Sequence, residues 1–289
     1  MRREPNQTGR IDSRLRQSVG RCWRAALWIE RHLTRRLRVL PDFLIIGAQR
    51  CGTTSLFRYL ERHPSILPAA VKEVHYFDDR FPRGDSWYRS HFPLSLRMRG
   101  HQTGEASPYY LFHPHVPRRV AEILPSAKLI ALLRNPVDRA WSQYHHERRF
   151  GFETATFEEA IERETERLAG EVETMLRDES HVSLTHRHHS YLARGRYAEQ
   201  LRHWSRYVPL ERMLCVKSED LYDDARSVVA RTFEYLELPP FEAGDYPAHN
   251  AVSSTAMDPE TRARLVRYFA PHNEELYGML GRDLGWDAT

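Results

Sequence analysis

The 289-residue chain has few cysteines and no long apolar segment. Its three cysteines, Cys22, Cys51 and Cys215, are far apart and odd in number, which argues against a disulfide framework and favours thiols kept reduced in a cytoplasm. The sequence contains no run of about 18 apolar residues that would suggest a transmembrane helix, and its arginine-rich start lacks the apolar core of a signal peptide. A cytoplasmic protein is therefore expected.

Positive charge is concentrated at one end of the chain. Eleven arginines face three acidic residues within residues 1–40, whereas the remainder is net negative although the whole chain carries a net charge of +4. The sequence pI of about 9.0 is thus poor support for nucleic-acid binding by the globular part, and no nucleic-acid partner is expected.

The chain is expected to consist of a basic amphipathic extension, residues 1–40, and one domain, residues 41–289. Apolar residues recur every three or four positions between the arginines of the extension, as in an amphipathic helix. Such a helix could make peripheral contact with an anionic membrane or reach a partner. Packing on its own domain or on a second subunit is the favoured alternative, and the oligomeric state is not predicted.

Short apolar strands alternate with helical segments along the domain. Strands are expected at 43–47, 103–108 (ending in a turn), 128–133 and 213–216, and helices at 53–62, 117–124, 135–150, 157–168, 197–207, 225–236 and 262–269. Such alternation is typical of a parallel sheet covered by helices. The sequence therefore predicts an α/β protein with a P-loop-like three-layer fold, in which helices flank a short, mainly parallel central sheet.

The segment Phe43–Leu56 reads as an apolar strand, a turn with Gly47 and Gly52 at its ends, and a helix that opens on hydroxyl residues. A helix start offers unpaired N–H groups and partial positive charge, so this turn should bind phosphate or sulfate. Its spacing is that of a nucleotide P-loop, but Thr53 stands where that loop has lysine. The helix start should also lower the pKa of Cys51, which is expected to contribute its backbone and no covalent step.

A second candidate anion site follows the strand at 128–133. Arg134 stands where an acidic residue would help to hold Mg²⁺ in a P-loop nucleotidase, and Ser142 lies two turns into the next helix. Arginine and serine could together bind a phosphate; alternatively, the arginine caps a loop and the serine faces solvent. Arg50 and Arg134, with no metal-binding carboxylate, favour an anion bound without a metal, so no metal site is expected.

These segments together are similar to the paired signature of the sulfotransferases that use 3′-phosphoadenosine 5′-phosphosulfate (PAPS). Phe43–Leu56 resembles their 5′-phosphosulfate-binding loop, and Leu133–Ser142 resembles their 3′-phosphate-binding motif. Three further segments, Lys72–Asp78, Gly104–Tyr109 and Gly281–Trp286, are similar to the heparan-sulfate (N- and 3-O-sulfotransferase) branch. The resemblance extends over nearly the whole chain after the basic extension.

The resemblance implies a sulfotransferase domain with PAPS as co-substrate and the bisphosphate PAP as product. Arg134 and Ser142 would bind the 3′-phosphate, which distinguishes PAPS from ATP. Relatives also have a basic loop near the C-terminus, which this chain lacks, so Arg196, or its neighbour Arg194, is expected to substitute. Carried over by position, the residues that would bind the 5′-phosphosulfate are Arg50, Cys51, Gly52, Thr53, Thr54 and Ser55.

The resemblance also implies a general base on the acceptor side. In heparan-type members the glutamate at the position of Glu73 is the base, with His75 and Asp78 nearby. In-line sulfuryl transfer to a hydroxyl or amine needs such a base, and it needs a cation on the leaving oxygen, which Arg50 would supply. His75 could act as the base instead, and Glu73 could otherwise be a surface carboxylate paired with Lys72.

Two departures from the family pattern bear on the reaction. Many relatives have lysine at the position of Arg50, and arginine keeps the charge but not the ability to donate a proton. Heparan-type members have lysine where this chain has Ala106, which weakens the case for a heparan-like acceptor. The expected acceptor is therefore a small molecule or glycan: a carbohydrate, a glycolipid or a secondary metabolite.

Two other classes of protein share parts of this pattern. A P-loop kinase or nucleotidase shares the loop but would need lysine at position 53, and a non-catalytic protein could use the basic extension to dock on a membrane or nucleic acid. The histidines of residues 181–189 and the pair His145–His146 lack metal-ligand spacing and are expected on solvated helix faces or in acceptor contacts. A PAPS-dependent sulfotransferase that requires no metal is the favoured function.

Overall fold

A parallel sheet forms the centre of the protein, for which a computed structural model describes residues 26–242, 244–247 and 256–287. The sheet within these residues has four strands in the order β2-β1-β3-β4, and every neighbouring pair is parallel. The strands are β1 (Phe43–Gly47), β2 (Gly104–Ala106), β3 (Lys128–Leu133) and β4 (Met213–Lys217).

Strand β1 is central and fully buried. The first four side chains of β1, from Phe43 to Ile46, are each 0% exposed, and Ile45 lies opposite Ala106 of β2 and Ile130 of β3. A continuous apolar run, without alternation, is what a parallel strand covered on both faces requires. This confirms the predicted strand at 43–47 and the mainly parallel sheet.

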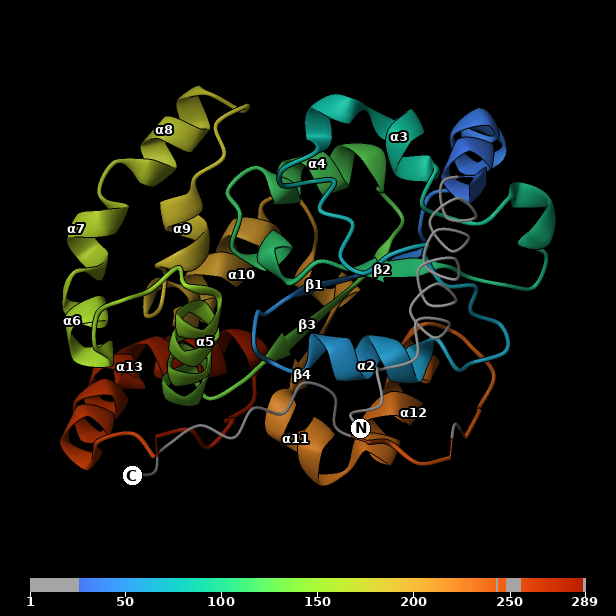
Figure 1. Ribbon diagram of the computed structural model, residues 1–289. Coiled ribbons are helices and arrows are strands. Elements are labelled where there is room, and N and C mark those ends of the chain that lie inside the picture. Colours follow the sequence, from blue (N-terminus) through green and yellow to red (C-terminus); the bar gives the residue numbers. More distant parts are fainter. Residues whose placement is uncertain (1–25, 243, 248–255, 288–289) are drawn as a thin grey trace, which may run out of the picture.

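Helices cover both faces of the sheet (Figure 1). Helices α2, α11 and α12 lie on one side, and α4 and α10 lie on the other. The helices are α2 (Thr53–Leu60), α3 (Asp85–Arg89), α4 (Val116–Ile123), α5 (Pro136–Phe150), α6 (Phe157–Glu162), α7 (Glu164–Leu168), α8 (Glu171–Arg177), α9 (Leu184–His188), α10 (Tyr197–Ser205), α11 (Ser218–Asp223), α12 (Ala225–Tyr235) and α13 (Pro259–Leu280). Short 3-10 turns are η1 (Arg35–Leu37), η2 (Phe81–Arg83), η3 (Ser95–Arg97), η4 (Pro108–Leu111), η5 (Ala193–Gly195) and η6 (Leu210–Arg212).

Helix α5 begins and ends where its sequence predicts. The Asn135 side chain accepts a hydrogen bond from the Val137 N–H, Pro136 occupies the first helical position, and Gly151 ends the helix with φ 78°. A second hydrophobic core, which includes Val137, packs α5 against α6 and α13. This core is separate from the main one around the sheet and fixes the helix that carries Ser142.

Two helix predictions differ from the structure. The predicted helix at 157–168 is two helices that meet at Arg163, because Glu164 turns inward and its carboxylate accepts the backbone N–H groups of Leu192 and Ala193. The predicted helix at 262–269 continues to Leu280 as α13, through Pro271.

The basic extension is described from residue 26 onward. Residues 26–33 are helical and are followed by η1, which confirms the helical character of this part. The remainder of the predicted amphipathic helix, with Leu15, Val19 and Cys22, lies outside the described residues. No helix in the described ranges combines the length and the apolarity needed to cross a bilayer.

Candidate functional site

The turn between β1 and α2 gathers backbone N–H groups at one point. Gly52, which precedes α2, provides no side-chain cap, so the N–H groups of Thr53 and Thr54 at the start of the helix can bind a ligand. Arg50 and Gly52 have positive φ angles of 69° and 85°. A Cβ atom at Gly52 would lie 3.1 Å from the Tyr222 hydroxyl, and one at Gly47 would lie 2.5 Å from Leu111 Cβ. Glycine is therefore needed at both ends of this anion-binding turn.

Two arginines meet at the turn without a carboxylate partner. Arg50 Nε donates to Ser142 Oγ at 3.0 Å, and Arg134 Nη1 donates to the carbonyl oxygen of Arg50 at 3.3 Å. In the part of the chain that the structure describes, these guanidinium groups contact no negatively charged group. Burial lowers the pKa of Arg50, and the charge of Arg134 lowers it further. The negative charge of a bound anion would offset the cost of burying these two cations together, so the residues fit a donor with two phosphate groups.

His146 belongs to the same cluster and was missed by the sequence analysis. It lies one helical turn after Ser142 on α5, and its Nδ1 is 3.5 Å from Arg50 Nη1. Burial and the charge of Arg50 lower the pKa of His146, whereas Glu147 and Glu73 raise it. His146 therefore joins the donor turn through its contact with Arg50. His146 is half-buried and so does not lie on a fully solvated helix face, the first of the two expected settings; its i,i+4 spacing from Ser142 could have identified this residue.

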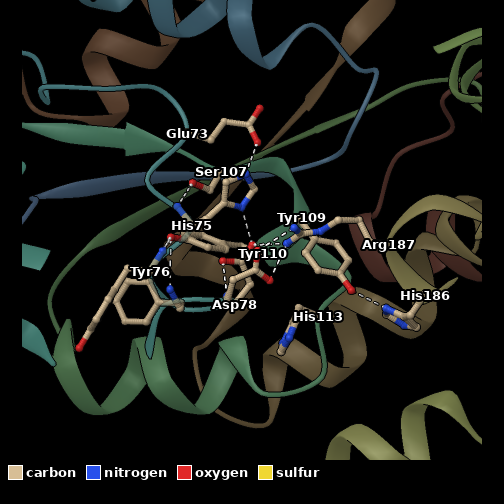
Figure 2. Close-up of polar contacts among 12 residues, drawn as sticks. Glu73, His75, Tyr76, Asp78, Ser107, Tyr109, Tyr110, His113, His186 and Arg187 are labelled. Atoms are coloured by element: carbon tan, nitrogen blue, oxygen red, sulfur yellow. Dashed lines mark hydrogen bonds and ion pairs between the residues drawn. The ribbon is translucent and has the colours of Figure 1, made fainter. Parts of the chain in front are cut away.

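Glu73, His75 and Asp78 form a continuous chain of polar contacts (Figure 2). His75 Nε2 lies 3.1 Å from a Glu73 carboxylate oxygen, and His75 Nδ1 lies 2.7 Å from Asp78 Oδ2. The Glu73 side chain is 32% exposed and also lies 3.3 Å from Lys72 Nζ, whereas the Asp78 side chain is fully buried. The structure thus brings together the three acceptor-side residues that the sequence suggested.

Arg187 extends this chain from α9. Its guanidinium lies 3.5 Å from the Asp78 carboxylate and 2.6 Å from that of Asp79, and it stacks over the Tyr109 ring at 4.7 Å (Figure 2). No motif in the sequence pointed to Arg187, because it is more than 100 positions from its partners.

The protonation states of the chain follow from its contacts. Burial would lower the pKa of His75, but hydrogen bonds to Asp78 and Glu73 outweigh it and raise the pKa to about 10. Burial would raise the pKa of Glu73, but the bond to His75 and the charge of Lys72 leave it below its usual value. At neutral pH, His75 is therefore a cation between two carboxylates, and Glu73 is the group able to accept a proton.

A buried polar network holds the loop that carries these residues. Ser107 Oγ accepts the backbone N–H of His75 at 3.2 Å. Glu105 is 0% exposed, and its carboxylate accepts the hydroxyl groups of Tyr88, Ser107 and Tyr110 at 2.6, 2.8 and 3.0 Å. Because the Glu105 carboxylate accepts all three hydroxyl groups, this buried network fixes Ser107 and, through it, the loop that carries His75.

The structure does not bring Arg196 to the donor turn. Its Nη1 pairs with Glu199 at 3.4 Å, and it lines a cavity of about 700 Å³ that α10 borders. Arg194, two positions earlier, is 3% exposed and donates to the side-chain oxygen of Gln49. Gln49 directly precedes Arg50 in the turn. Of the two arginines considered as substitutes for a basic loop, only Arg194 therefore touches the turn within the described residues.

Cys51 behaves differently from the sequence expectation. Burial raises the pKa of its thiol, with the charge of Arg139 opposing this effect, so the predicted lowering by the helix start was wrong. The Cys51 side chain is 0% exposed, and its carbonyl oxygen accepts the Ser218 hydroxyl at 2.7 Å. A buried, protonated thiol is inert, so the residue contributes its backbone to the turn.

The histidines of residues 181–189, expected on a solvated helix face or in acceptor contacts, include the buried His186 and the half-buried His188. His186 is 2% exposed, stacks on Phe112 with ring centroids 4.3 Å apart, and lies 2.7 Å from the Tyr109 hydroxyl. His188 is half-buried and lies 2.9 Å from the Glu147 carboxylate. These side chains pack the segment that carries Arg187.

Known proteins resemble this chain over most of its length. A family model described as "Sulfotransferase domain" matches residues 40–255. The chain is 29% identical to "Membrane-associated sulfotransferase kil1" of Dictyostelium discoideum, over 87% of this chain and 67% of that protein. It is 31% identical to human "Heparan sulfate glucosamine 3-O-sulfotransferase 6", over 86% of this chain and 74% of that protein. Among solved structures, a sulfotransferase from Alicyclobacillus acidocaldarius is 31% identical with a TM-score of 0.69, over 86% of this chain and all of that one.

Proposed function

The chain belongs to the sulfotransferase family, and we propose that it transfers a sulfuryl group from PAPS, in line, to a hydroxyl or amine of a small-molecule or glycan acceptor. One observation carries this proposal. Arg50 and Arg134 have no carboxylate partner in the described part of the chain, and Arg50 contacts His146, whose pKa the charge of Glu73 contributes to raising. Uncompensated positive charge at an anion-binding turn, together with a candidate base, suits the transfer of an anionic group. The family assignment favours this function over a P-loop kinase, a nucleotidase or a non-catalytic docking protein.

The donor would be held by backbone and side chains of the turn. The N–H groups at the start of α2, from Gly52 to Ser55, would bind the 5′-phosphosulfate together with Arg50. Arg134 and Ser142 would bind the 3′-phosphate, the first as a planar fork and the second as a hydroxyl donor. The bond from Arg50 to Ser142 supports this assignment because it joins the two phosphate subsites.

Glu73 is the proposed general base. It would accept the proton of the acceptor hydroxyl or amine as the new bond to sulfur forms. His75, with its pKa near 10, is already protonated at neutral pH and so would orient Glu73 without taking the proton itself. Asp78 and Arg187 would fix His75 in this orientation.

The leaving side of the reaction rests on Arg50 and His146. Arg50 would offset the charge that develops on the leaving phosphate, but a guanidinium does not release a proton. His146 contacts Arg50 and has a lowered pKa, so it is neutral at pH 7 and would act there by hydrogen bonding. Arg50, by its charge, and His146, by its hydrogen bond, would together replace the lysine found in many relatives.

The acceptor is proposed to be a carbohydrate, a glycolipid or a secondary metabolite. The name of the human relative specifies a glucosamine of heparan sulfate. In this chain, however, position 106 in β2 is a fully buried alanine where heparan-type members have lysine. The missing cation argues for a less anionic acceptor than heparan sulfate.

The setting of the enzyme is also part of the proposal. We propose a cytoplasmic location from the cysteine pattern, and Cys51 and Cys215 are both free thiols. No nucleic-acid partner is proposed. Peripheral membrane contact through the N-terminal helix is supported by the name of the Dictyostelium relative, which is called membrane-associated.

No metal is proposed to take part. His75, Asp78 and Asp79 offer three ligand atoms within 4.8 Å of one another. These three groups are already paired with opposite charges: His75 with Glu73, and Asp78 and Asp79 with Arg187. Activity should therefore persist in EDTA, and a loss that only Mg²⁺ or Mn²⁺ restores would contradict this part of the proposal.

Thermal-shift titration tests the donor assignment. PAP without metal should raise the unfolding temperature, whereas ATP with Mg²⁺ should have a much smaller effect because it lacks the 3′-phosphate. Stabilisation by ATP with Mg²⁺ alone would contradict the proposal. Labelled PAPS incubated with extracts of the source organism would then identify the acceptor.

A further inference from the structure

The segment of residues 26–38 packs on the domain through arginines and leaves apolar side chains outside. Arg31 Nη1 donates to the carbonyl oxygen of Ser90 at 3.1 Å, and Arg38 Nη1 donates to that of Phe92 at 2.7 Å. An amphipathic surface helix ordinarily turns its apolar face toward the core. Here two arginines and Trp28, whose ring packs edge-on against His91 at 5.0 Å, attach the helix to the domain, so the apolar side chains that remain outside need another explanation.

Three apolar residues of this segment are strongly exposed. Ile29, Leu33 and Leu37 are 62%, 76% and 61% exposed, and they are spaced four positions apart. Residues at this spacing lie on one side of a helix. Ile29 and Leu33 therefore lie on one side of the helix, and Leu37 follows in η1, exposed as well; we call these three residues the apolar stripe.

A second segment extends this stripe. Arg38 pairs with Leu94 in an antiparallel bridge, so the two segments meet at this point. Leu96 of η3 is 78% exposed. Arg97 follows Leu96 directly and is also exposed. We call the combined surface the leucine–arginine face; it consists of Ile29, Leu33, Leu37 and Leu96 with the exposed Arg36, Arg97 and Arg99.

Positive charge dominates around the leucine–arginine face. Residues 26–38 and 94–101 contain six arginines and a single acidic residue, Glu30. Glu30 pairs with Arg38 at 2.8 Å and so offsets one of these charges. Exposed leucines within a cationic surface match the two layers of a membrane interface: anionic headgroups outside and acyl chains beneath them.

We propose that the leucine–arginine face docks on the surface of a bilayer that contains anionic lipid. The arginines would contact the headgroups, and the four apolar side chains would enter the boundary with the acyl chains. This inference rests on the membrane contact proposed above and specifies its surface and its lipid class. It does not depend on the sulfuryl-transfer chemistry.

Other occupants fit the face less well. A second copy of the chain, docked by the same face, would set arginines against arginines. Residues 1–25 carry seven arginines against Glu4 and Asp12, so their charge would be repelled by the face. Nucleic acid would contact the arginines but leave the leucines in water.

Vesicle flotation of the full chain tests the docking surface. The unmodified protein should float with vesicles of phosphatidylcholine containing about 30% phosphatidylglycerol, and much less with pure phosphatidylcholine. The double variant Leu33→Asp, Leu96→Asp should reduce the partition coefficient about tenfold per substitution, because each leucine no longer enters the bilayer. Leu184→Asp, which changes an equally apolar residue that is 61% exposed on α9, is the matched control and should float normally.

The outcomes separate this surface from the broader proposals. Flotation of the double variant equal to that of the unmodified chain would overturn the surface and assign membrane contact to residues 1–25. Absence of flotation for the unmodified chain would overturn membrane contact altogether. A dimer in light scattering that the double variant disperses would instead identify a second copy as the occupant. PAP-induced stabilisation of the double variant serves as the check that the domain is folded and that the donor site is intact.

Discussion

The donor side and the acceptor side of the site solve the problem of buried charge in opposite ways. On the donor side, Arg50 and Arg134 lie together, and their described contacts are with a hydroxyl, an imidazole and a carbonyl group. On the acceptor side, each charge has an opposite partner, from Glu73 through His75 to Asp78 and Arg187. One half is electrostatically incomplete and the other is complete.

This difference predicts how each half responds to substitution. Removal of a donor-side cation relieves repulsion in the ligand-free protein, so the cost should appear in donor binding. Removal of one member of the acceptor-side chain strands its buried partner, so the cost should appear in stability as well as turnover. A measurement of both quantities for each variant therefore tests the comparison directly.

The largest effect is expected for Glu73→Gln. Glutamine keeps the size of the side chain but cannot accept the acceptor proton, so kcat should fall by about 10²- to 10⁴-fold. PAP affinity in a thermal-shift titration should be unchanged, because Glu73 does not contact the donor turn. Glu122→Gln, on the exposed face of α4, is the control. Retained activity would show that the base lies elsewhere.

Arg134→Ala should act mainly on the donor. Loss of the proposed 3′-phosphate ligand should weaken PAP binding by about 2–5 kcal/mol, as expected when a buried charge loses its partner. The unfolding temperature without PAP should not fall, since the substitution removes a neighbouring positive charge from Arg50. Arg149→Ala, at the exposed end of α5, should change neither quantity. If Arg134→Ala lost stability and kept PAP affinity, Arg134 would have a structural role and would not be a ligand of the donor.

The sequence predicted the donor side more completely than the acceptor side, for a physical reason. An anion-binding turn is local: Gly47, Arg50 and Gly52 are close in the sequence, and the apolar run before them fixes the strand. On the acceptor side, Glu73, His75 and Asp78 are close in the sequence as well, but Arg187 joins them only after α9 folds back. Burial likewise reversed the expected pKa of Cys51, and no sequence window reports burial of that kind. His146 was within reach because its spacing from Ser142 is local.

The acceptor-side chain should make stability depend on pH. The pKa of His75 is about 10 in the folded protein and near 6.5 when unfolded, so its contribution is complete below pH 6.5 and is lost as the pH rises toward 10. The unfolding free energy should fall by up to about 2 kcal/mol between pH 7 and 9 from this group. His75→Gln should flatten that part of the urea-midpoint profile. If the urea midpoint falls equally steeply with pH in both proteins, His75 is not stabilised as a cation by Glu73 and Asp78.

The smallest effect is expected for His146→Gln. His146 contacts Arg50, and the charge of Glu73 contributes to raising its pKa. Arg50 already supplies the positive charge that the leaving phosphate needs, so the histidine adds only a hydrogen bond. We therefore expect kcat to fall about tenfold, below the range typical of a general acid, with PAP affinity nearly unchanged. His145→Gln, the adjacent residue that packs edge-on against Trp141, should leave kcat unchanged. A loss of a thousandfold or more would make His146 the proton donor to the leaving group, and the leaving side would then depend on a titrating residue in place of two fixed cations.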